Sequence, residues 1–135
     1  MDWYLKVLKQ YTRFNGRARR KEYWYFQLIN FLIFLFLTIL ALLFASLSQQ
    51  SDSISNGIAL IVIIIGLLRT IYSLGVLLPS LAVNIRRLHD IGKSGWWCLI
   101  GLVPIVGSLI LLYFLVQDSK PGANRFGRNP KESID

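Results

Sequence analysis

Three long runs of hydrophobic residues, at 24–47, 58–85 and 96–116, alternate with polar stretches along this chain. Each run reaches the ~20 residues that an α-helix needs to cross a hydrocarbon core of about 30 Å. The sequence therefore predicts an all-α membrane protein in which three transmembrane helices and a polar tail at 117–135 form one membrane domain, 1–135. The hydrophobic share of 54% agrees with this class, because soluble domains have roughly 45–50%.

The segment before the first run predicts a short amphipathic helix over residues 2–14. One face of this helix gathers hydrophobic and aromatic side chains and the opposite face gathers cations: Trp3, Tyr4, Val7, Leu8, Tyr11 and Phe14 against Lys6, Lys9 and Arg13. Such a helix either lies at the headgroup boundary or packs against the rest of the protein, and the two are compatible. The helix is expected to end at Asn15-Gly16, because glycine accepts the left-handed conformation that follows many helices.

The charges predict how the chain is oriented. The net charge is +8, and the basic residues flank the hydrophobic runs, which favours anionic lipid over nucleic acid as the partner. The loop at 48–57 has no lysine or arginine and one acid, Asp52. By the positive-inside rule this loop is extracytoplasmic and the N-terminus is cytoplasmic.

The second run is longer than a membrane requires, since 28 residues of helix span about 42 Å, and it contains Arg69. No acidic residue lies within any of the three runs, so a mid-membrane arginine would have no ionic partner. We therefore place Arg86 and Arg87 at the cytoplasmic interface and expect the Arg69 side chain to extend to the outer headgroups.

Pro104 and Gly107 interrupt the third run and leave two alternatives. A full crossing puts the C-terminus outside. A re-entrant hairpin puts it inside, together with all the lysines and arginines except Arg69, as the positive-inside rule prefers. The nearly continuous apolar length favours the full crossing, which is the prediction.

The polar stretch at 86–97, RRLHDIGKSGWW, concentrates groups that can hold a charged partner. It is expected to be a cytoplasmic loop in which Ser94 caps the next helix. The N–H groups of a helix start and three nearby cations predict an anion cradle. Its ligand is a lipid phosphate, a nucleotide or the carboxylate of Asp90.

Catalytic and metal chemistry find little support. His89 is the one histidine and Cys98 the one cysteine, so one chain cannot assemble a zinc site of nitrogen and sulfur ligands. Gly92-Lys93-Ser94 lacks the upstream glycine of a phosphate-binding loop, whose place Arg87 takes. We assign no catalytic residue and expect no cofactor, and hydrogen bonding at the interface is the expected role of His89.

The tail, from Ser119 to Ser133, is rich in turn-forming residues and is either disordered or docked on the protein or the headgroups. Together, the basic run, the central stretch and the tail supply the residues predicted to bind an anion or a partner. They are Arg17, Arg20, Arg86, Arg87, His89, Asp90, Lys93, Ser94, Asn124 and Arg125.

Three motifs, GRARRKEYW at 16–24, RRLHDIGKSGWW at 86–97 and PGANRFGRNP at 121–130, resemble the signatures of a bacterial inner-membrane family, domain of unknown function 805. The resemblance covers essentially the whole chain. It implies a multi-pass protein of the inner membrane and brings no established reaction, substrate or cofactor.

The leading hypothesis is a non-enzymatic membrane module whose basic cytoplasmic rim binds anionic lipid or a partner protein. One alternative is a subunit of a small oligomeric transporter or channel, with Arg69 facing an aqueous path. The other is an enzyme acting on lipid headgroups, with His89 and Asp90 as an acid and base pair.

Overall fold

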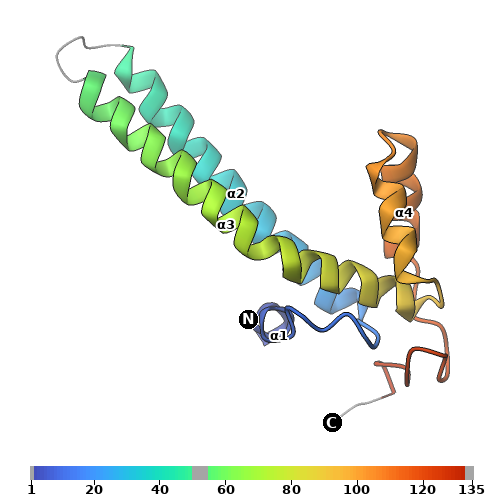
Figure 1. The fold of residues 1–135 in the computed structure, drawn as a ribbon. Coiled ribbons are helices and arrows are strands. Elements are labelled where there is room, and N and C mark those ends of the chain that lie inside the picture. Colours follow the sequence, from blue (N-terminus) through green and yellow to red (C-terminus); the bar gives the residue numbers. More distant parts are fainter. Residues whose placement is uncertain (1, 50–54, 133–135) are drawn as a thin grey trace. The chain divides into compact units, whose positions relative to one another are not determined.

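The computed structural model of the chain describes residues 2–49 and 55–132, and every regular element in this part is helical (Figure 1). In chain order the elements are α1 (Asp2–Lys9), α2 (Arg20–Ser48), α3 (Ser55–Asp90), the 3₁₀-helix η1 (Gly95–Leu102) and α4 (Val106–Val116). The predicted all-α class is confirmed for these residues. Within the predicted external loop, residues 50–54 with Asp52 lie outside the described part.

Two helices, α2 and α3, are long and apolar enough to cross a membrane. Their most apolar windows are only 6% and 11% buried in the protein. A core helix of a soluble protein would bury such a window, whereas a helix surrounded by lipid leaves its apolar side chains on the outside. The first two predicted spans therefore have helices of sufficient length, and α4 is shorter than a span.

Helix α3 continues past its apolar run, so the prediction that 86–90 belongs to a loop is wrong. The helix ends at Asp90, and it is terminated by Gly92, whose φ of +78° suits a glycine. The Lys93 N–H donates to the Leu88 carbonyl at 2.9 Å, and the Gly92 N–H donates to the His89 carbonyl at 3.0 Å. These two bonds form a Schellman motif. The polar stretch therefore presents its first five side chains from a helix.

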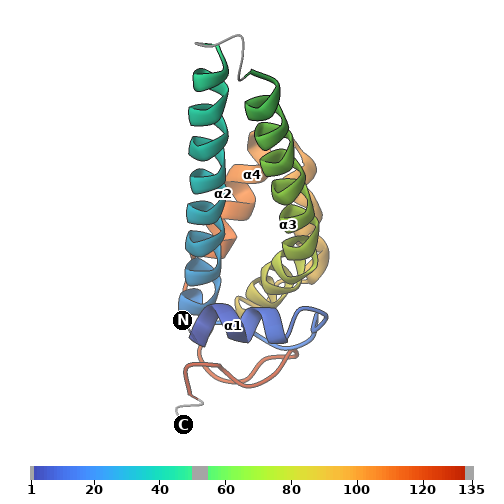
Figure 2. The ribbon, with the colours of Figure 1, turned by 90° about the vertical axis from the view of Figure 1, so that its left-hand side faces the viewer.

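The chain forms two compact units, Leu28–Leu77 and the combination of Met1–Gln27 with Leu78–Asp135. In the first of these, the α2 and α3 stretches run side by side (Figures 1 and 2). The Tyr72 hydroxyl donates to Asn30 Oδ1 at 2.5 Å, and the Arg69 guanidinium lies 5.8 Å from the centre of the Phe34 ring. The Arg69 charge thus meets an aromatic face; its predicted depth in the membrane stays a prediction.

In the other unit, α1 ends at Lys9 and is shorter than the predicted 2–14. The Gln10 N–H bonds to both Lys6 and Val7 carbonyls, which tightens the backbone into a turn. Tyr4 stacks on Phe26 with 5.3 Å between ring centres, and Val7 is fully buried. Helix α1 therefore packs against the protein, as one of the two alternatives held, and its location at the headgroup boundary stays a prediction.

The third apolar run, predicted to make a full crossing, is divided into η1 and α4, and these two helices pack against each other. The ring of Trp97 meets the ring of Phe114 edge to face, with 5.5 Å between centres. Nearer the tip, a Cβ added to Gly101 would lie 2.9 Å from the Leu111 side chain. We call residues 95–116 the apolar hairpin.

The tip of the apolar hairpin is a turn of three residues. The Val106 N–H donates to the Pro104 carbonyl at 2.7 Å across Ile105, whose φ is +63°, the geometry of a strained γ-turn. Proline disfavours helical conformation in the residue before it, which breaks the helix. A Cβ on Gly107 would overlap the Ile100 carbonyl, so glycine lets the two arms meet.

Candidate functional site

The buried carboxylate of Asp90, at the end of α3, joins two of the predicted arginines. Its Oδ1 accepts from Arg17 Nε at 2.9 Å. Its Oδ2 accepts from Arg87 Nη1 at 2.6 Å and from the Ser119 hydroxyl at 2.5 Å. Asp90 and Arg87 are fully buried, and Arg17 has 1% of its side chain exposed. We call these four residues the Asp90 cluster.

Arg17 fastens the tail to the rest of its unit. Its Nη1 donates to the Gly122 carbonyl at 2.8 Å, and its Nη2 donates to the Lys120 carbonyl at 2.7 Å and the Asp90 carbonyl at 3.2 Å. The planar guanidinium fits this set because its donors have a fixed fork geometry. The N–H donors of Arg17 are therefore bonded to other groups of the protein.

Arg87 binds the end of the apolar hairpin. Its Nε donates to the Leu115 carbonyl at 3.2 Å, and its Nη2 donates to the Gln117 carbonyl. The last carbonyls of a helix lack partners within the helix and carry a partial negative charge, so a cation there is favourable. Arg87 thus holds the hairpin's second arm beside α3.

A second buried ion pair lies beside the Asp90 cluster. Arg86 Nη1 donates to Glu22 Oε1 at 3.2 Å and to the Gln10 side chain, and Lys6 Nζ donates to Glu22 Oε2 at 3.2 Å. Glu22 has 1% of its side chain exposed. Sequence reasoning missed this residue, although it is the one acid in the basic stretch before the first span.

A hydrogen bond and a ring contact hold the His89 side chain in place. Its Nδ1 lies 3.1 Å from the Gly16 carbonyl oxygen, so this nitrogen is the donor, and its ring stacks on Phe126 with 3.8 Å between centres. The His89 carbonyl accepts from Asn124 Nδ2 at 2.9 Å. His89 therefore forms hydrogen bonds as expected, whereas its location at the membrane interface stays a prediction, and Asn124 docks the tail on α3.

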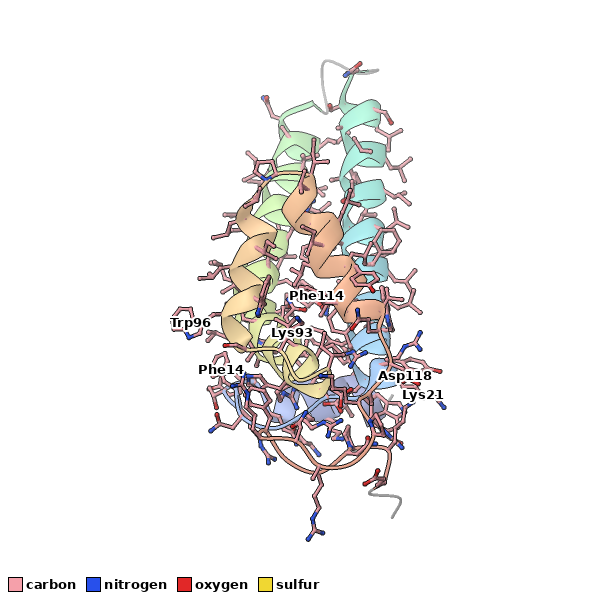
Figure 3. All side chains as sticks on the ribbon, turned by 90° about the vertical axis from the view of Figure 1, so that its right-hand side faces the viewer. Phe14, Lys21, Lys93, Trp96, Phe114 and Asp118 are labelled. Atoms are coloured by element: carbon pink, nitrogen blue, oxygen red, sulfur yellow. The ribbon has the colours of Figure 1, made fainter. Side chains whose placement is uncertain are left out.

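Ser94 and Lys93 lie at the base of the apolar hairpin. The Ser94 hydroxyl accepts from the Trp96 N–H at 3.5 Å, so the predicted N-cap is confirmed, although the helix it starts is a 3₁₀-helix. Lys93 Nζ lies 5.2 Å from the ring centres of both Trp97 and Phe114, and Figure 3 labels Lys93 and Phe114. Lys93 therefore contacts aromatic rings of the hairpin.

The five predicted arginines thus separate into two groups. Arg17, Arg86 and Arg87 lie in buried ion pairs. Three ligands were expected for the anion cradle, and the one that Arg17 and Arg87 bind in the structure is the Asp90 carboxylate. Arg20 and Arg125 stay exposed. Ionic contacts decide this separation, and a one-dimensional sequence does not display them.

Four cations, of which all but the half-buried Arg19 are exposed, line a cavity of about 390 Å³. We call this cavity the basic groove; its lining is Arg19, Arg20, Lys21, Asp118 and Lys131. Lys131 Nζ donates to Asp118 Oδ1 at 2.5 Å, and this bond holds the pKa of Asp118 below its usual range. Figure 3 shows Lys21 and Asp118 close together. One ionised acid among four cations leaves the groove net positive.

The family comparison agrees with the three motifs. The model of the family described as protein of unknown function DUF805 matches residues 11–128. The chain belongs to the DUF805 family. Inner membrane protein YhaH of Escherichia coli (strain K12) is 50% identical to this DUF805 protein over 131 residues, which are 97% of this chain and 98% of the relative.

A second relative from the same strain, inner membrane protein YhaI, is 43% identical over 132 residues, 97% of each chain. No solved structure matches this DUF805 protein. Its relatives and its two long apolar helices support an inner-membrane location.

Proposed function

We propose that this DUF805 protein is a non-enzymatic module of the inner membrane whose basic groove binds the phosphate of anionic lipid headgroups. The observation that carries the proposal is the set of four cations around one cavity, of which Arg20, Lys21 and Lys131 are exposed and Arg19 is half-buried. Arginine and lysine side chains recognise phosphate through charge-assisted hydrogen bonds, and anionic lipids attract such clusters beside membrane spans.

The Asp90 cluster supports this proposal as a scaffold. It links the segment before α2, the end of α3 and the tail. The groove takes its lining from the end of that segment, the first turn of α2 and the tail. Both Asp90 oxygens are engaged and buried, so Asp90 is not placed to exchange protons with a headgroup. A binding role therefore accounts for the geometry better than the His89 and Asp90 acid and base pair.

The ion pair inside the groove is suited to exchange with a ligand. Lys131 and Asp118 have 44% and 57% of their side chains exposed, and exposed pairs contribute only about 0–1 kcal/mol. A phosphate that enters the groove can therefore replace Asp118 as the partner of Lys131 with little loss of free energy.

Removing the groove's charges should weaken lipid binding. We expect the combined variant Arg20→Gln, Lys21→Gln and Lys131→Gln to retain about tenfold less phosphatidylglycerol, taking about 0.5 kcal/mol for each exposed contact. Native mass spectrometry of the purified protein, released from detergent in the presence of phosphatidylglycerol or phosphatidylethanolamine, measures the retained lipid.

Two controls separate the groove from general charge. The variant Lys9→Gln, Arg13→Gln and Arg128→Gln removes the same charge from exposed residues outside the groove and should retain most of the phosphatidylglycerol. Asp118→Asn removes the groove's acid and should raise retention. Equal losses in the two triple variants would reject the groove as the binding site.

We further propose that α2 and α3 cross the membrane, that the apolar hairpin re-enters it from the cytoplasmic side, and that both termini are cytoplasmic. Eight residues of 3₁₀-helix and eleven of α-helix each span about 16 Å, close to one leaflet of a core about 30 Å thick. This topology also puts all the basic tail residues inside, as the positive-inside rule prefers.

Reporter fusions test this topology. Green fluorescent protein fused to the C-terminus should fluoresce, and alkaline phosphatase should be inactive there, because the phosphatase folds only outside the cytoplasm. A phosphatase fused after Ser48, at the end of α2, should be active and serves as the matched positive control. An active phosphatase at the C-terminus would mean that the hairpin region crosses the membrane.

A further inference from the structure

A second cavity, of about 530 Å³, lies between the loop after α1, α3, η1 and the tail, and we call it the apolar cavity. Its wall includes Leu81, Trp96, Leu99 and Phe126. Ligand sites in proteins commonly measure about 300–1,000 Å³ and have mostly apolar linings with a few polar groups. Figure 3 shows Phe14 and Trp96, both lining residues, away from Lys21 and Asp118 of the basic groove.

The apolar cavity is continuous with the outer surface of the hairpin's first arm. Trp96 is 79% exposed and Leu99 is 54% exposed, and both side chains also line the cavity. Tryptophan is enriched at the boundary between headgroups and hydrocarbon. In the topology proposed above, the cavity therefore opens toward lipid at this depth.

Polar groups occur at the same cavity. The Ser94 hydroxyl accepts from the Trp96 N–H, so its own proton is available to a further acceptor. An ester carbonyl of a glycerolipid is such an acceptor, and it lies between the hydrocarbon chain and the phosphate. If a lipid acyl chain occupied the cavity, Ser94, which lines the cavity, would be available to bond the ester carbonyl at the end of that chain.

A cation marks the edge of the cavity. The Arg125 guanidinium carbon lies 4.6 Å from the centre of the Phe126 ring, and this ring both lines the cavity and stacks on His89. Arg125 is exposed, and among residues 2–49 and 55–132 no carboxylate pairs with it. Its charge is thus available to an anion at the end of an apolar pocket.

We propose that the apolar cavity binds one acyl chain of an anionic phospholipid, with Arg125 contacting the phosphate and Ser94 donating to an ester carbonyl. The charge at the edge distinguishes this occupant from a zwitterionic or uncharged lipid. The site uses none of the residues of the basic groove, so it can exist whether or not the groove binds a headgroup.

Cys98 gives a direct readout because it lines the cavity and is the chain's one cysteine. The full-length protein in non-ionic detergent is treated with a maleimide, and the labelling rate of Cys98 is measured with phosphatidylglycerol, with phosphatidylcholine and without lipid. Phosphatidylglycerol should slow labelling about tenfold when nine-tenths of the sites are occupied, because only the unoccupied fraction reacts. Phosphatidylcholine should slow it much less.

Variants identify the parts of the site. Arg125→Gln should make the two lipids equal, and Leu81→Trp should fill the cavity and remove the lipid effect, whereas Leu102→Trp adds the same side chain outside the cavity and should preserve it. The groove variant Arg20→Gln, Lys21→Gln and Lys131→Gln should preserve the protection of Cys98, which separates this test from that of the groove.

A reporter outside the cavity excludes general shielding by lipid. In Cys98→Ser, Leu102→Cys protein, labelling should not respond to phosphatidylglycerol, because Leu102 does not line the cavity. Equal labelling of Cys98 under all three conditions, equal slowing by both lipids, or equal slowing at positions 98 and 102 would each overturn the proposal.

Discussion

Asp90→Asn is expected to destabilise the protein by about 3–5 kcal/mol, the cost of removing one partner from a buried ion pair. The substitution keeps the shape of the side chain and removes its charge. Arg17 and Arg87 would then remain buried as uncompensated cations. The measurement is the midpoint of thermal unfolding in detergent, together with the rate at which trypsin cleaves the tail, because Arg17 and Ser119 hold the tail through this cluster.

Asp118→Asn is the matched control for this prediction. It removes the same charge by the same substitution, but from an ion pair with Lys131 that is half exposed. Its effect on unfolding should stay below about 1 kcal/mol. If the two substitutions lowered the unfolding midpoint equally, the Asp90 cluster would not be the main polar support of this unit.

Gly107→Ala is expected to prevent the apolar hairpin from closing in its native form. The added Cβ would overlap the Ile100 carbonyl and approach the Val103 side chain to 2.7 Å. A backbone group has little freedom to retreat, so we expect a loss of at least about 1–3 kcal/mol, the usual range for overpacking. A lower unfolding midpoint and faster maleimide labelling of Cys98, on the opposite arm, would measure this opening.

Gly75→Ala is the control that separates the effect of replacing a glycine from the effect of the steric overlap at Gly107. Gly75 lies within α3, and a Cβ added there would meet nothing within 4 Å. Alanine is the better helix former by about 1 kcal/mol, so this variant should be neutral or slightly more stable. Unchanged unfolding in Gly107→Ala would mean that the two arms of the hairpin do not meet at this point.

The long helices were predictable because their signals are local. The apolar runs at 24–47 and 58–85 predicted helices that the structure begins at Arg20 and Ser55. The second helix exceeds its prediction because polar residues at 86–90 do not break a helix, and the first strong stop is Gly92. Hydrophobicity thus located the apolar part of each helix, and the backbone chemistry of the flanking residues decided its ends.

The sequence of the apolar hairpin allows two arrangements. Pro104 and Gly107 are compatible with a hairpin, whereas the nearly unbroken hydrophobicity favours one crossing. Composition reports how much apolar length is present, while the direction of the chain depends on one turn and on the fit of Gly107 against the opposite arm. That fit involves contacts between residues that periodicity does not relate to each other.

The candidate residues were found more reliably than their roles. Arg17, Arg87 and Asp90 were all singled out from the sequence, and the structure brings them together through side-chain bonds. The cations lining the groove were mostly missed, since of them only Arg20 was singled out. A sequence does not show which cations are neutralised by a buried acid and which remain exposed.

By itself, the sequence determined that this is an all-α protein with long apolar helices, because helix formation and apolar length depend on neighbouring residues. Only the tertiary structure decided that the third apolar run is a hairpin and that Arg17 joins the three motifs through its bonds to Asp90 and Gly122. Those outcomes depend on partners 73 positions apart in the Arg17 and Asp90 pair and 105 apart in the Arg17 and Gly122 contact. The physical reason is that a buried charge requires a hydrogen-bonded or oppositely charged partner nearby, and the fold of the whole chain determines which residue becomes that partner.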